Sequence, residues 1–316
     1  MPLLTNFGTL SARAFGVSVG GAGLAFVTVA GGTSTTAAYS TNGGQTWAAS
    51  TLPSSQDWFN VAYGGGTFVA VASATSTAAA YSTNGGQTWT ASTMPSAQNW
   101  YGIAASGSTF VAISNTAGTA AAYSTNGGQT WTASTLPSSQ SWTDVAYGGG
   151  TFVTVAGGTS ATAAYSTNGG QTWTASTLPS SQDWYGIAAS GSTFVAVGGV
   201  GTAGAYSTNG GQTWTASTLP SSQEWYAVAY GGGTFVAVAA GAANTAAAYS
   251  TDGGQTWTAS TLPSSQVWDG IAYGNGVFVA TAVGPTTAGA YSTDGGQTWT
   301  ATTLPSSQDW RGIAYG

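Results

Sequence analysis

The stretch that decides the fold is Tyr-Ser-Thr-Asn-Gly-Gly-Gln-Thr-Trp, at residues 39–47. Further copies, with Asn or Asp in fourth place, occupy residues 81–89, 123–131, 165–173, 206–214, 249–257 and 291–299. Successive copies begin 42, 42, 42, 41, 43 and 42 residues apart. A constant period of this length is typical of repeat architectures, so we expect a single repeat domain over residues 1–316.

Each repeat has the pattern of four short strands. In the second repeat, alternating or wholly apolar runs predict strands at 59–63, 68–72, 78–82 and 87–92, separated by glycine-rich or small-residue turns. Pro95 indicates that residues 93–98 form a connection to the next repeat, because proline cannot donate a ladder hydrogen bond. Four strands per repeat of about 40–45 residues predict an all-β protein, a single seven-bladed β-propeller of four-stranded antiparallel blades.

The first-strand pattern occurs once more than the other three. The two terminal copies are the degenerate stretch 17–20 and Trp310–Gly316. One of them has to complete the first blade, because an unpaired strand edge there would invite aggregation. The second copy matches the other repeats better, so we expect 310–316 to close the ring and residues 1–13 to form an N-terminal arm.

The composition restricts the classes of ligand. Charged residues make up 3% of the chain, against about 25% in an average soluble protein, and the only cations are Arg13 and Arg311. A net charge of −6 with two arginines argues against nucleic acid and against anionic membrane surfaces. We expect no cofactor and no metal site, because the chain has no His or Cys and its acids lack a ligand spacing.

No apolar run approaches the roughly 20 residues needed to cross a bilayer, so we expect no membrane insertion. The first residues lack the basic and apolar regions of a secretory signal peptide. We leave the localisation open, with the extracellular space or a virion surface as possibilities, and we expect a monomeric ring.

The repeated stretch carries a family resemblance. Ser40-Thr41-Asn42-Gly43-Gly44-Gln45-Thr46-Trp47 resembles the Asp-box, or bacterial neuraminidase repeat, Ser-x-Asp-x-Gly-x-Thr-Trp. The resemblance implies a structural turn between the third and fourth strands, in which the Asn or Asp side chain accepts backbone hydrogen bonds and the tryptophan packs into the blade. The implied structural residues are Asn42, Asn84, Asn126, Asn168, Asn209, Asp252, Asp294, Trp47, Trp89, Trp131, Trp173, Trp214, Trp257 and Trp299.

The same resemblance raises sialidase activity, which the sequence argues against. The resemblance implies that a sialidase would need three clustered arginines to bind the substrate carboxylate, and a tyrosine nucleophile with an acidic partner. Two arginines near opposite ends of the chain cannot provide that cluster. Without Lys, His or Cys, the other usual nucleophiles and bases are missing as well. We therefore predict a protein that is not an enzyme.

Differences between the repeats suggest where a ligand binds. Repeat length changes only in the loop between the second and third strands, at 198–204 and 239–246, and sequence also varies around a second repeated tryptophan in the link between blades. Antiparallel strand order places both segments on one face, which we call the linker face. The opposite face, the Asp-box face, carries the Asp-box and the turn between the first and second strands, which we take to be constant.

The linker face provides the candidate ligand-binding residues, an aromatic and polar set at each blade junction. Alternatively, these tryptophans only seal the blade interfaces and their neighbours are simply solvated. The candidates are Asp57, Trp58, Phe59, Asn99, Trp100, Tyr101, Trp142, Asp144, Asp183, Trp184, Tyr185, Glu224, Trp225, Tyr226, Trp268, Asp269, Asp309 and Trp310.

Aromatic faces that stack on sugars, with amides and carboxylates for the hydroxyl groups, favour a lectin-like protein that binds neutral glycans through several weak sites. An alternative is a structural or attachment component of a larger protein assembly, such as a virion decoration or tail-associated protein. A third possibility is an engineered or recently amplified propeller scaffold.

Overall fold

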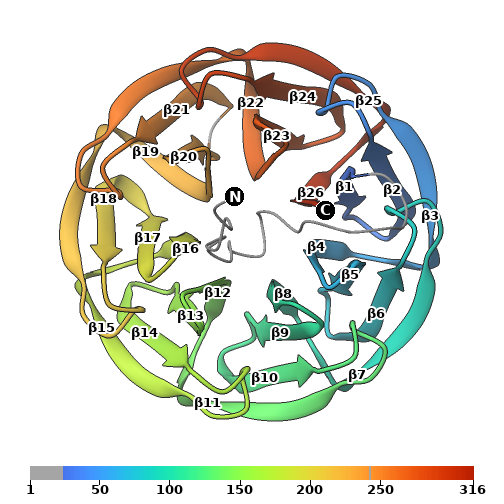
Figure 1. Ribbon diagram of the computed structural model, residues 1–316, viewed down its shortest axis with the longest axis horizontal. Coiled ribbons are helices and arrows are strands. Elements are labelled where there is room, and N and C mark those ends of the chain that lie inside the picture. Colours follow the sequence, from blue (N-terminus) through green and yellow to red (C-terminus); the bar gives the residue numbers. More distant parts are fainter. Residues whose placement is uncertain (1–23, 242) are drawn as a thin grey trace, which may run out of the picture.

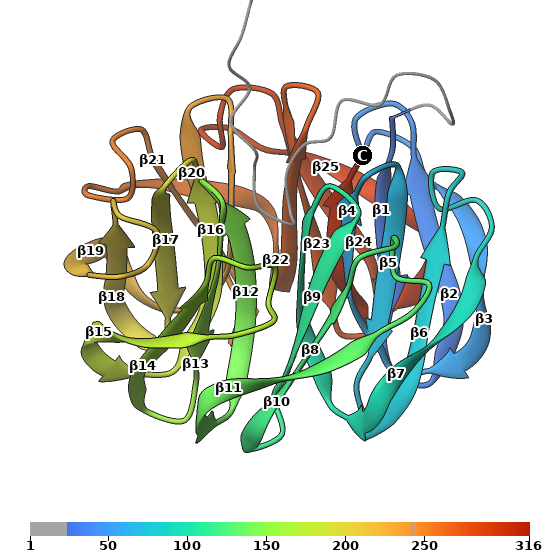
Figure 2. The same ribbon diagram turned by 60° about the horizontal axis from the view of Figure 1, so that its bottom comes forward.

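The computed structural model describes residues 24–241 and 243–316, and it confirms the seven-bladed β-propeller. The blades stand around a central axis, as Figure 1 shows, and their strands run roughly between the two faces of the ring, as Figure 2 shows. Within each blade the first strand lies nearest the axis and the fourth lies at the periphery.

Blades 1–4 are separate four-stranded antiparallel sheets. Blade 1 contains β26 (Trp310–Tyr315), β1 (Phe26–Ala30), β2 (Ser34–Ser40) and β3 (Ala48–Gln56). Blade 2 contains β4 (Trp58–Gly64), β5 (Thr67–Ala72), β6 (Ser76–Ser82) and β7 (Thr90–Gln98). Blade 3 contains β8 (Trp100–Ser106), β9 (Thr109–Ser114), β10 (Gly118–Ser124) and β11 (Thr132–Gln140). Blade 4 contains β12 (Trp142–Gly148), β13 (Thr151–Ala156), β14 (Ser160–Ser166) and β15 (Thr174–Gln182).

Blades 5–7 form one continuous ten-stranded sheet, because two outer strands run without a break into the inner strand of the next blade. Blade 5 contains β16 (Trp184–Ser190), β17 (Thr193–Gly198), β18 (Val200–Ser207) and the first part of β19 (Thr215–Gly231). Blade 6 contains the rest of β19, β20 (Thr234–Ala239), β21 (Asn244–Ser250) and the first part of β22 (Thr258–Gly274). Blade 7 contains the rest of β22, β23 (Val277–Val283), β24 (Thr286–Ser292) and β25 (Thr300–Gln308).

The first blade is assembled from both ends of the described chain. β26 pairs antiparallel with β1, with Phe26 opposite Tyr315 and Thr28 opposite Ile313. The C-terminal copy of the first-strand pattern therefore occupies the innermost position of blade 1. The other copy, at 17–20, and the expected arm at 1–13 lie outside the described residues.

The outer strand differs from its predicted position. In blade 2 it begins at Thr90 rather than Gln87 and includes the segment with Pro95, which we had taken as a connection. The register jumps from Ala78–Thr93 to Ser76–Gln98, so this segment bulges out of the ladder. Proline is tolerated because the strand is at the edge of its sheet, where a missing N–H leaves no strand unpaired.

The Asp-box turn forms the hydrogen bonds that its sequence predicts. The Asn42 Oδ1 atom accepts hydrogen bonds from the Ser40 hydroxyl (2.9 Å) and the Thr46 amide (3.0 Å), and the Trp47 indole donates to the Gly44 carbonyl (3.0 Å). The turn therefore holds Thr46 and Trp47, and the outer strand begins only after them, at Ala48.

The same turn also joins neighbouring blades. Gly128 has a φ of 79°, and a Cβ atom on it would come within 2.6 Å of the Val69 side chain in blade 2. A similar contact joins Gly170 to Val111 and Gly211 to Val153. The second glycine of the Asp-box is thus required twice, for its left-handed backbone and for the space that a valine of the preceding blade fills.

Candidate functional site

The seven tryptophans of the linker face are all buried, which contradicts their prediction as ligand-stacking residues. Each has an exposed fraction of 0%, so no indole face can reach a ligand. In blade 5 the Trp184 indole donates a hydrogen bond to the Ser180 carbonyl in the outer-strand bulge (3.2 Å), and a similar bond joins Trp58 to Ser54 (3.0 Å). The affected residues are Trp58, Trp100, Trp142, Trp184, Trp225, Trp268 and Trp310.

In several blades the side chain of the residue before the buried tryptophan holds the variable loops. The Asp57 carboxylate accepts hydrogen bonds from the Gly32 amide (2.8 Å) and the Ser73 hydroxyl (2.6 Å), which belong to the loops of two adjacent blades. The Asn99 side chain accepts from the Thr75 amide (2.6 Å).

Acidic residues before other buried tryptophans also hold loops. Asp183 accepts from the amides of Gly158 and Thr159, and Asp309 accepts from Gly284 (2.9 Å). At Glu224 the backbone carbonyl, rather than the carboxylate, accepts a hydrogen bond from the Ala240 amide (2.9 Å). These half-buried groups hold backbone of unusual conformation, with φ values of 72° at Gly32 and 56° at Thr75. Their first role is to position loops rather than a ligand.

Two further predicted acids are buried. Asp144 is 4% exposed and accepts hydrogen bonds from the Val145 amide (2.9 Å) and from the Ile187 amide of blade 5 (3.1 Å). Asp269 is 6% exposed and lies 3.5 Å from the Arg311 guanidinium in blade 1. Both carboxylates therefore join blades, because a buried charge needs a partner or backbone donors.

The residues that follow the buried tryptophans meet at the axis. We call Phe59, Tyr101, Tyr185, Tyr226, Asp269 and Arg311 the axial cluster. Tyr101 of blade 3 and Tyr226 of blade 6 share a hydrogen bond between their hydroxyl groups (2.8 Å), so these side chains cross the axis. The Tyr101 ring stacks on Phe59 (3.6 Å between centroids), and Tyr226 packs against Tyr185 (5.1 Å).

The electrostatics of the axial cluster follow from its burial. Burial raises the pKa of Tyr101 to about 12, against a contrary contribution from the Tyr226 hydrogen bond, and burial likewise raises the pKa of Tyr226. Burial alone would lower the pKa of the Arg311 guanidinium, but the neighbouring Asp269 raises it overall. Arg311 also lies over the Phe59 ring, 5.3 Å from its centroid. This charged member of the cluster was not among the predicted site residues.

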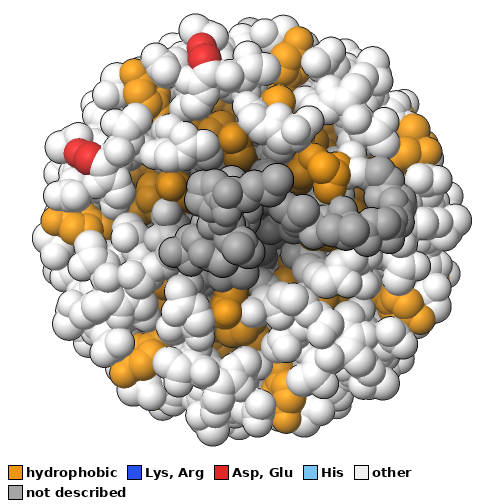
Figure 3. All heavy atoms as spheres, viewed as in Figure 1, with side chains coloured by type: hydrophobic (Ala, Val, Ile, Leu, Met, Phe, Trp, Pro, Cys, Tyr) orange, Lys and Arg blue, Asp and Glu red, His pale blue; other side chains and the backbone are white. Residues whose placement is uncertain are grey.

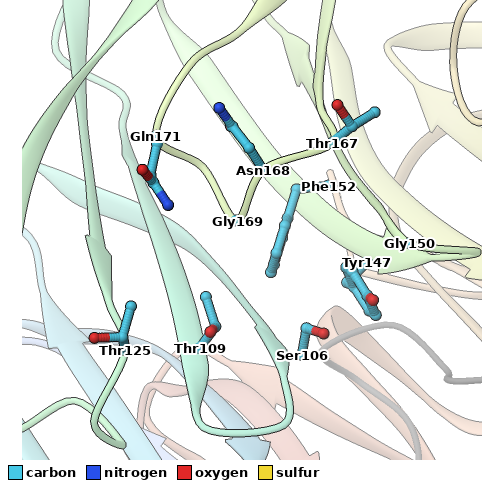
Figure 4. Close-up of a pocket in the computed structure, with 10 residues that line it drawn as sticks. All are labelled: Ser106, Thr109, Thr125, Tyr147, Gly150, Phe152, Thr167, Asn168, Gly169 and Gln171. Atoms are coloured by element: carbon cyan, nitrogen blue, oxygen red, sulfur yellow. The ribbon is translucent and has the colours of Figure 1, made fainter.

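The structure instead shows a groove on the Asp-box face, between blades 3 and 4. It has a volume of about 300 Å³, and Figure 4 shows its lining side chains around an open centre. We call it the blade 3–4 groove; its lining residues are Ser106, Thr109, Thr125, Tyr147, Gly150, Phe152, Thr167, Asn168, Gly169 and Gln171. No lining side chain carries a formal charge, and most are hydroxyls or amides, with Tyr147 as a half-exposed aromatic ring.

The groove coincides with a change in the turn between the first and second strands. Most blades have Tyr-Gly at this position, and where the preceding blade also has the glycine, the tyrosine ring lies over it. A Cβ atom on Gly231 would fall 1.9 Å from the Tyr273 ring, and one on Gly274 would fall 1.9 Å from the Tyr315 ring. In blade 3 Ser106 replaces the glycine, and Figure 4 shows it beside Tyr147 at one end of the groove.

The groove was not among the predicted sites, because the turn between the first and second strands was taken to be constant. The signal was present: blades 3 and 5 have Ala-Ser-Gly-Ser at 105–108 and 189–192, where blades 2, 4 and 6 have Tyr-Gly-Gly-Gly. The difference also changes exposure, since Thr109 and Thr193 are half-buried whereas Thr67, Thr151 and Thr234 are buried.

The visible surface around the ring carries few charges. Figure 3 shows one face on which charged side chains are few, and the acidic side chains in view lie near its edge. Among residues 24–241 and 243–316, no three His, Cys, Asp or Glu side chains gather as a metal site would require. Nor does this part of the chain contain a helix long and apolar enough to cross a membrane.

Comparison with known proteins identifies the repeat. The model of the BNR/Asp-box repeat matches residues 38–49, 80–91, 122–133, 164–175, 205–216, 248–259 and 290–301. The chain is an Asp-box β-propeller. No relative was found among curated proteins. In this Asp-box propeller the seven matched segments are the turns between the third and fourth strands, each with the last residues of the third strand and the first residues of the fourth.

Solved structures similar to this Asp-box propeller show the fold alone. "YCF48 bound to D1 peptide" matches with a TM-score of 0.60 and 19% identity, over 79% of this chain and 82% of that one. YCF48 from Cyanidioschyzon merolae matches with a TM-score of 0.60 and 16% identity, over 81% and 88%. The computationally designed Ika8 protein matches with a TM-score of 0.59 and 11% identity, over 91% and 90%.

Proposed function

We propose that this Asp-box propeller is a non-catalytic recognition protein that binds uncharged, hydroxyl-rich ligands of the glycan class in the blade 3–4 groove. The observation that carries the proposal is the groove lining, a half-exposed tyrosine surrounded by hydroxyl and amide side chains without a formal charge. Ligand sites of this kind combine an aromatic surface with a few polar groups that fix orientation.

The volume and the charge of the groove define the ligand further. About 300 Å³ is at the small end of ligand pockets, which suits one or two sugar rings. Because the chain has a net charge of −6, an anionic glycan would be repelled, whereas a neutral one would not. Arg311 is the only arginine among the described residues and is already engaged by Asp269, which argues against recognition of a substrate carboxylate.

The number of sites follows from the turn sequence. Because Ala-Ser-Gly-Ser recurs in blade 5, a related groove is expected between blades 5 and 6, with Asp252 in the place of Asn168. The Asp252 carboxylate would make that second groove a weaker site for an uncharged ligand, so the gain from multivalency should be smaller than seven equal sites would provide.

The test is a glycan array followed by titration of the best uncharged ligand. Gln171→Ala removes an exposed groove amide, and binding should weaken about tenfold, the loss expected for one hydrogen bond. The matched control is Gln129→Ala, which changes the same Asp-box position in blade 3 outside the groove lining and should leave binding unchanged. Equal effects of the two substitutions would contradict the proposed site.

A structural or attachment role is the second outcome of this experiment. A folded protein that binds no uncharged glycan, and that elutes with a larger particle from its native source, would support that role. The near absence of charged side chains is compatible with a surface that other protein subunits cover.

A further inference from the structure

Four Asp-boxes, those of Asn84, Asn126, Asn168 and Asn209, have one nine-residue sequence, and the three in blades 3, 4 and 5 lie in different surroundings. Asn126, Asn168 and Asn209 each stand in Ser-Thr-Asn-Gly-Gly-Gln-Thr-Trp-Thr, so their local sequences are identical. Their side chains are also held alike. In each box the amide Oδ1 atom accepts a hydrogen bond from the threonine four residues later, at 3.0 Å. Any difference in their chemistry must therefore come from the rest of the fold.

The difference lies in the backbone amide that follows each asparagine. The Gly127 amide donates a hydrogen bond to the Ser108 carbonyl (2.9 Å), and the Gly210 amide donates to the Ser192 carbonyl (2.9 Å). The Gly169 amide has no such partner among the described residues. Gly127 and Gly210 are buried, whereas Gly169 is half-buried.

The turn between the first and second strands of each blade explains this difference in hydrogen bonding. In blade 4 the turn has two residues with positive φ, Gly149 at 56° and Gly150 at 86°. In blade 3 only Gly107 has a positive φ, at 55°, and Ser108 follows in an ordinary conformation. The two turns therefore orient their last carbonyl differently, and only the one in blade 3 directs it at the Asp-box amide.

We propose that Asn168 is a site of spontaneous deamidation, and that Asn126 and Asn209 are protected from it. The backbone nitrogen of Gly169 attacks the side-chain carbonyl carbon of Asn168, a C–N bond forms, and the side-chain nitrogen leaves as ammonia. Water then opens the cyclic imide, which gives aspartate, or isoaspartate if the other carbonyl is attacked. In the protected boxes, the glycine N–H must first leave its serine carbonyl before its nitrogen can attack.

The fold accommodates the aspartate product. Asp252 occupies the corresponding position in blade 6, where the Thr256 hydroxyl donates a hydrogen bond to its carboxylate (2.6 Å). In the box of Asn168 the direction is reversed, and the asparagine N–H donates to the Thr172 hydroxyl. Partial burial acts to raise the pKa of Asp252, but hydrogen bonds from Thr256 lower it overall. An aspartate at position 168 would therefore be ionised at neutral pH and would place a negative charge in the blade 3–4 groove.

The experiment follows the three sites in one sample of folded protein at mildly alkaline pH. Chymotryptic cleavage after tyrosine and tryptophan would yield the same Asp-box peptide from each site. The digestion must therefore leave each Asp-box joined to the preceding loop between the second and third strands. The sequence of this loop differs between blades 3, 4 and 5 and so identifies the site. Mass spectrometry should show Asn168 converting about tenfold faster than Asn126 or Asn209, which corresponds to about 1.4 kcal/mol for the hydrogen bond that must break.

Two controls decide the result. In strong denaturant the three sites should react at one rate, because their local sequences are identical. The double variant Ser106→Gly, Ser108→Gly gives blade 3 the glycine turn of blade 4, and it should raise the folded-state rate at Asn126. Equal rates at the three sites in the folded protein, or faster reaction at Asn126, would overturn the proposal.

The consequence for binding rests on the proposed function and is measured separately. Asn168→Asp should weaken the binding of an uncharged glycan in the groove, while Asn126→Asp should not. Because the deamidation rates are read without any ligand, failure of glycan binding would leave the modification proposal standing. If the three deamidation rates were equal but an uncharged glycan still bound in the groove, the deamidation proposal would fail and the proposed function would stand.

Discussion

The two ends of the central channel use their side chains in opposite ways. At the linker end the sequence varies from blade to blade, yet the varied residues are buried at blade interfaces, hydrogen-bonded to loops or packed across the axis. At the Asp-box end the sequence is close to a strict repeat, yet one small departure in a turn coincides with a groove. Variation between repeats therefore does not by itself indicate a surface that meets ligands.

The largest expected effect tests the linker end. Trp184→Ala removes a wholly buried indole and should lower the free energy of unfolding by about 3–5 kcal/mol. Trp173→Ala, at the half-exposed Asp-box tryptophan of blade 4, should lower it by only about 1–2 kcal/mol. Denaturant titration measures both. If Trp184→Ala kept its stability and lost glycan binding, the tryptophans would be ligand residues after all.

A smaller effect should appear with alkaline pH. The pKa of Tyr101 is raised from 10.0 to about 12 in the folded protein, so the unfolded chain loses its phenol proton first. The contribution of Tyr101 to the free energy of unfolding should be constant below pH 10 and fall by about 2–3 kcal/mol between pH 10 and pH 12.

The variant Tyr101→Phe is the control for the axial cluster. It removes both the Tyr226 hydrogen bond and the titrating group, so the fall in stability above pH 10 should become shallower. Denaturant titrations at several pH values would show this. An unchanged slope would mean that the phenol of Tyr101 is solvated and that the linker end is more open than the structure indicates.

The smallest effect tests the Asp-box end. Gly128→Ala and Gly66→Ala both place a side chain on a left-handed residue, with φ of 79° and 83°. At Gly128 the new Cβ atom would also come within 2.6 Å of Val69, whereas at Gly66 it would meet nothing within 4 Å. We expect a loss of about 1 kcal/mol for Gly66→Ala and about twice that for Gly128→Ala. Equal losses would show that the turn does not lock the blades together.

The repeat predicted the architecture well because its physical signals are local. The spacing of the Asp-boxes, the glycine turns and the apolar second strand of each repeat define four strands and a blade without knowledge of neighbouring blades. The inner strands of neighbouring blades also approach closely at glycine positions, since a Cβ atom on Gly186 would come within 2.7 Å of the Tyr226 carbonyl. Glycine at such a position needs no long-range information to be interpreted.

The site was predicted poorly because exposure is a property of the assembled ring. Trp184 has the composition of a lectin residue, and only its place between two blades shows that it is buried. Asp144 resembles a surface acid in sequence, yet it accepts an amide proton from Ile187 in the next blade. The groove lining comes from two repeats at once, with Thr109 on one side and Asn168 on the other, so no single repeat contains it.

By itself, the sequence determined the number of blades, the strand order within each blade and the Asp-box turns, because hydrogen bonds and backbone preferences within about ten residues specify them. Only the tertiary structure decided that the linker-face tryptophans are core, that tyrosines cross the axis and that the Asp-box face carries the groove. These features depend on contacts between residues one to three repeats apart, such as Tyr101 with Tyr226, whose separation of 125 residues no local pattern encodes.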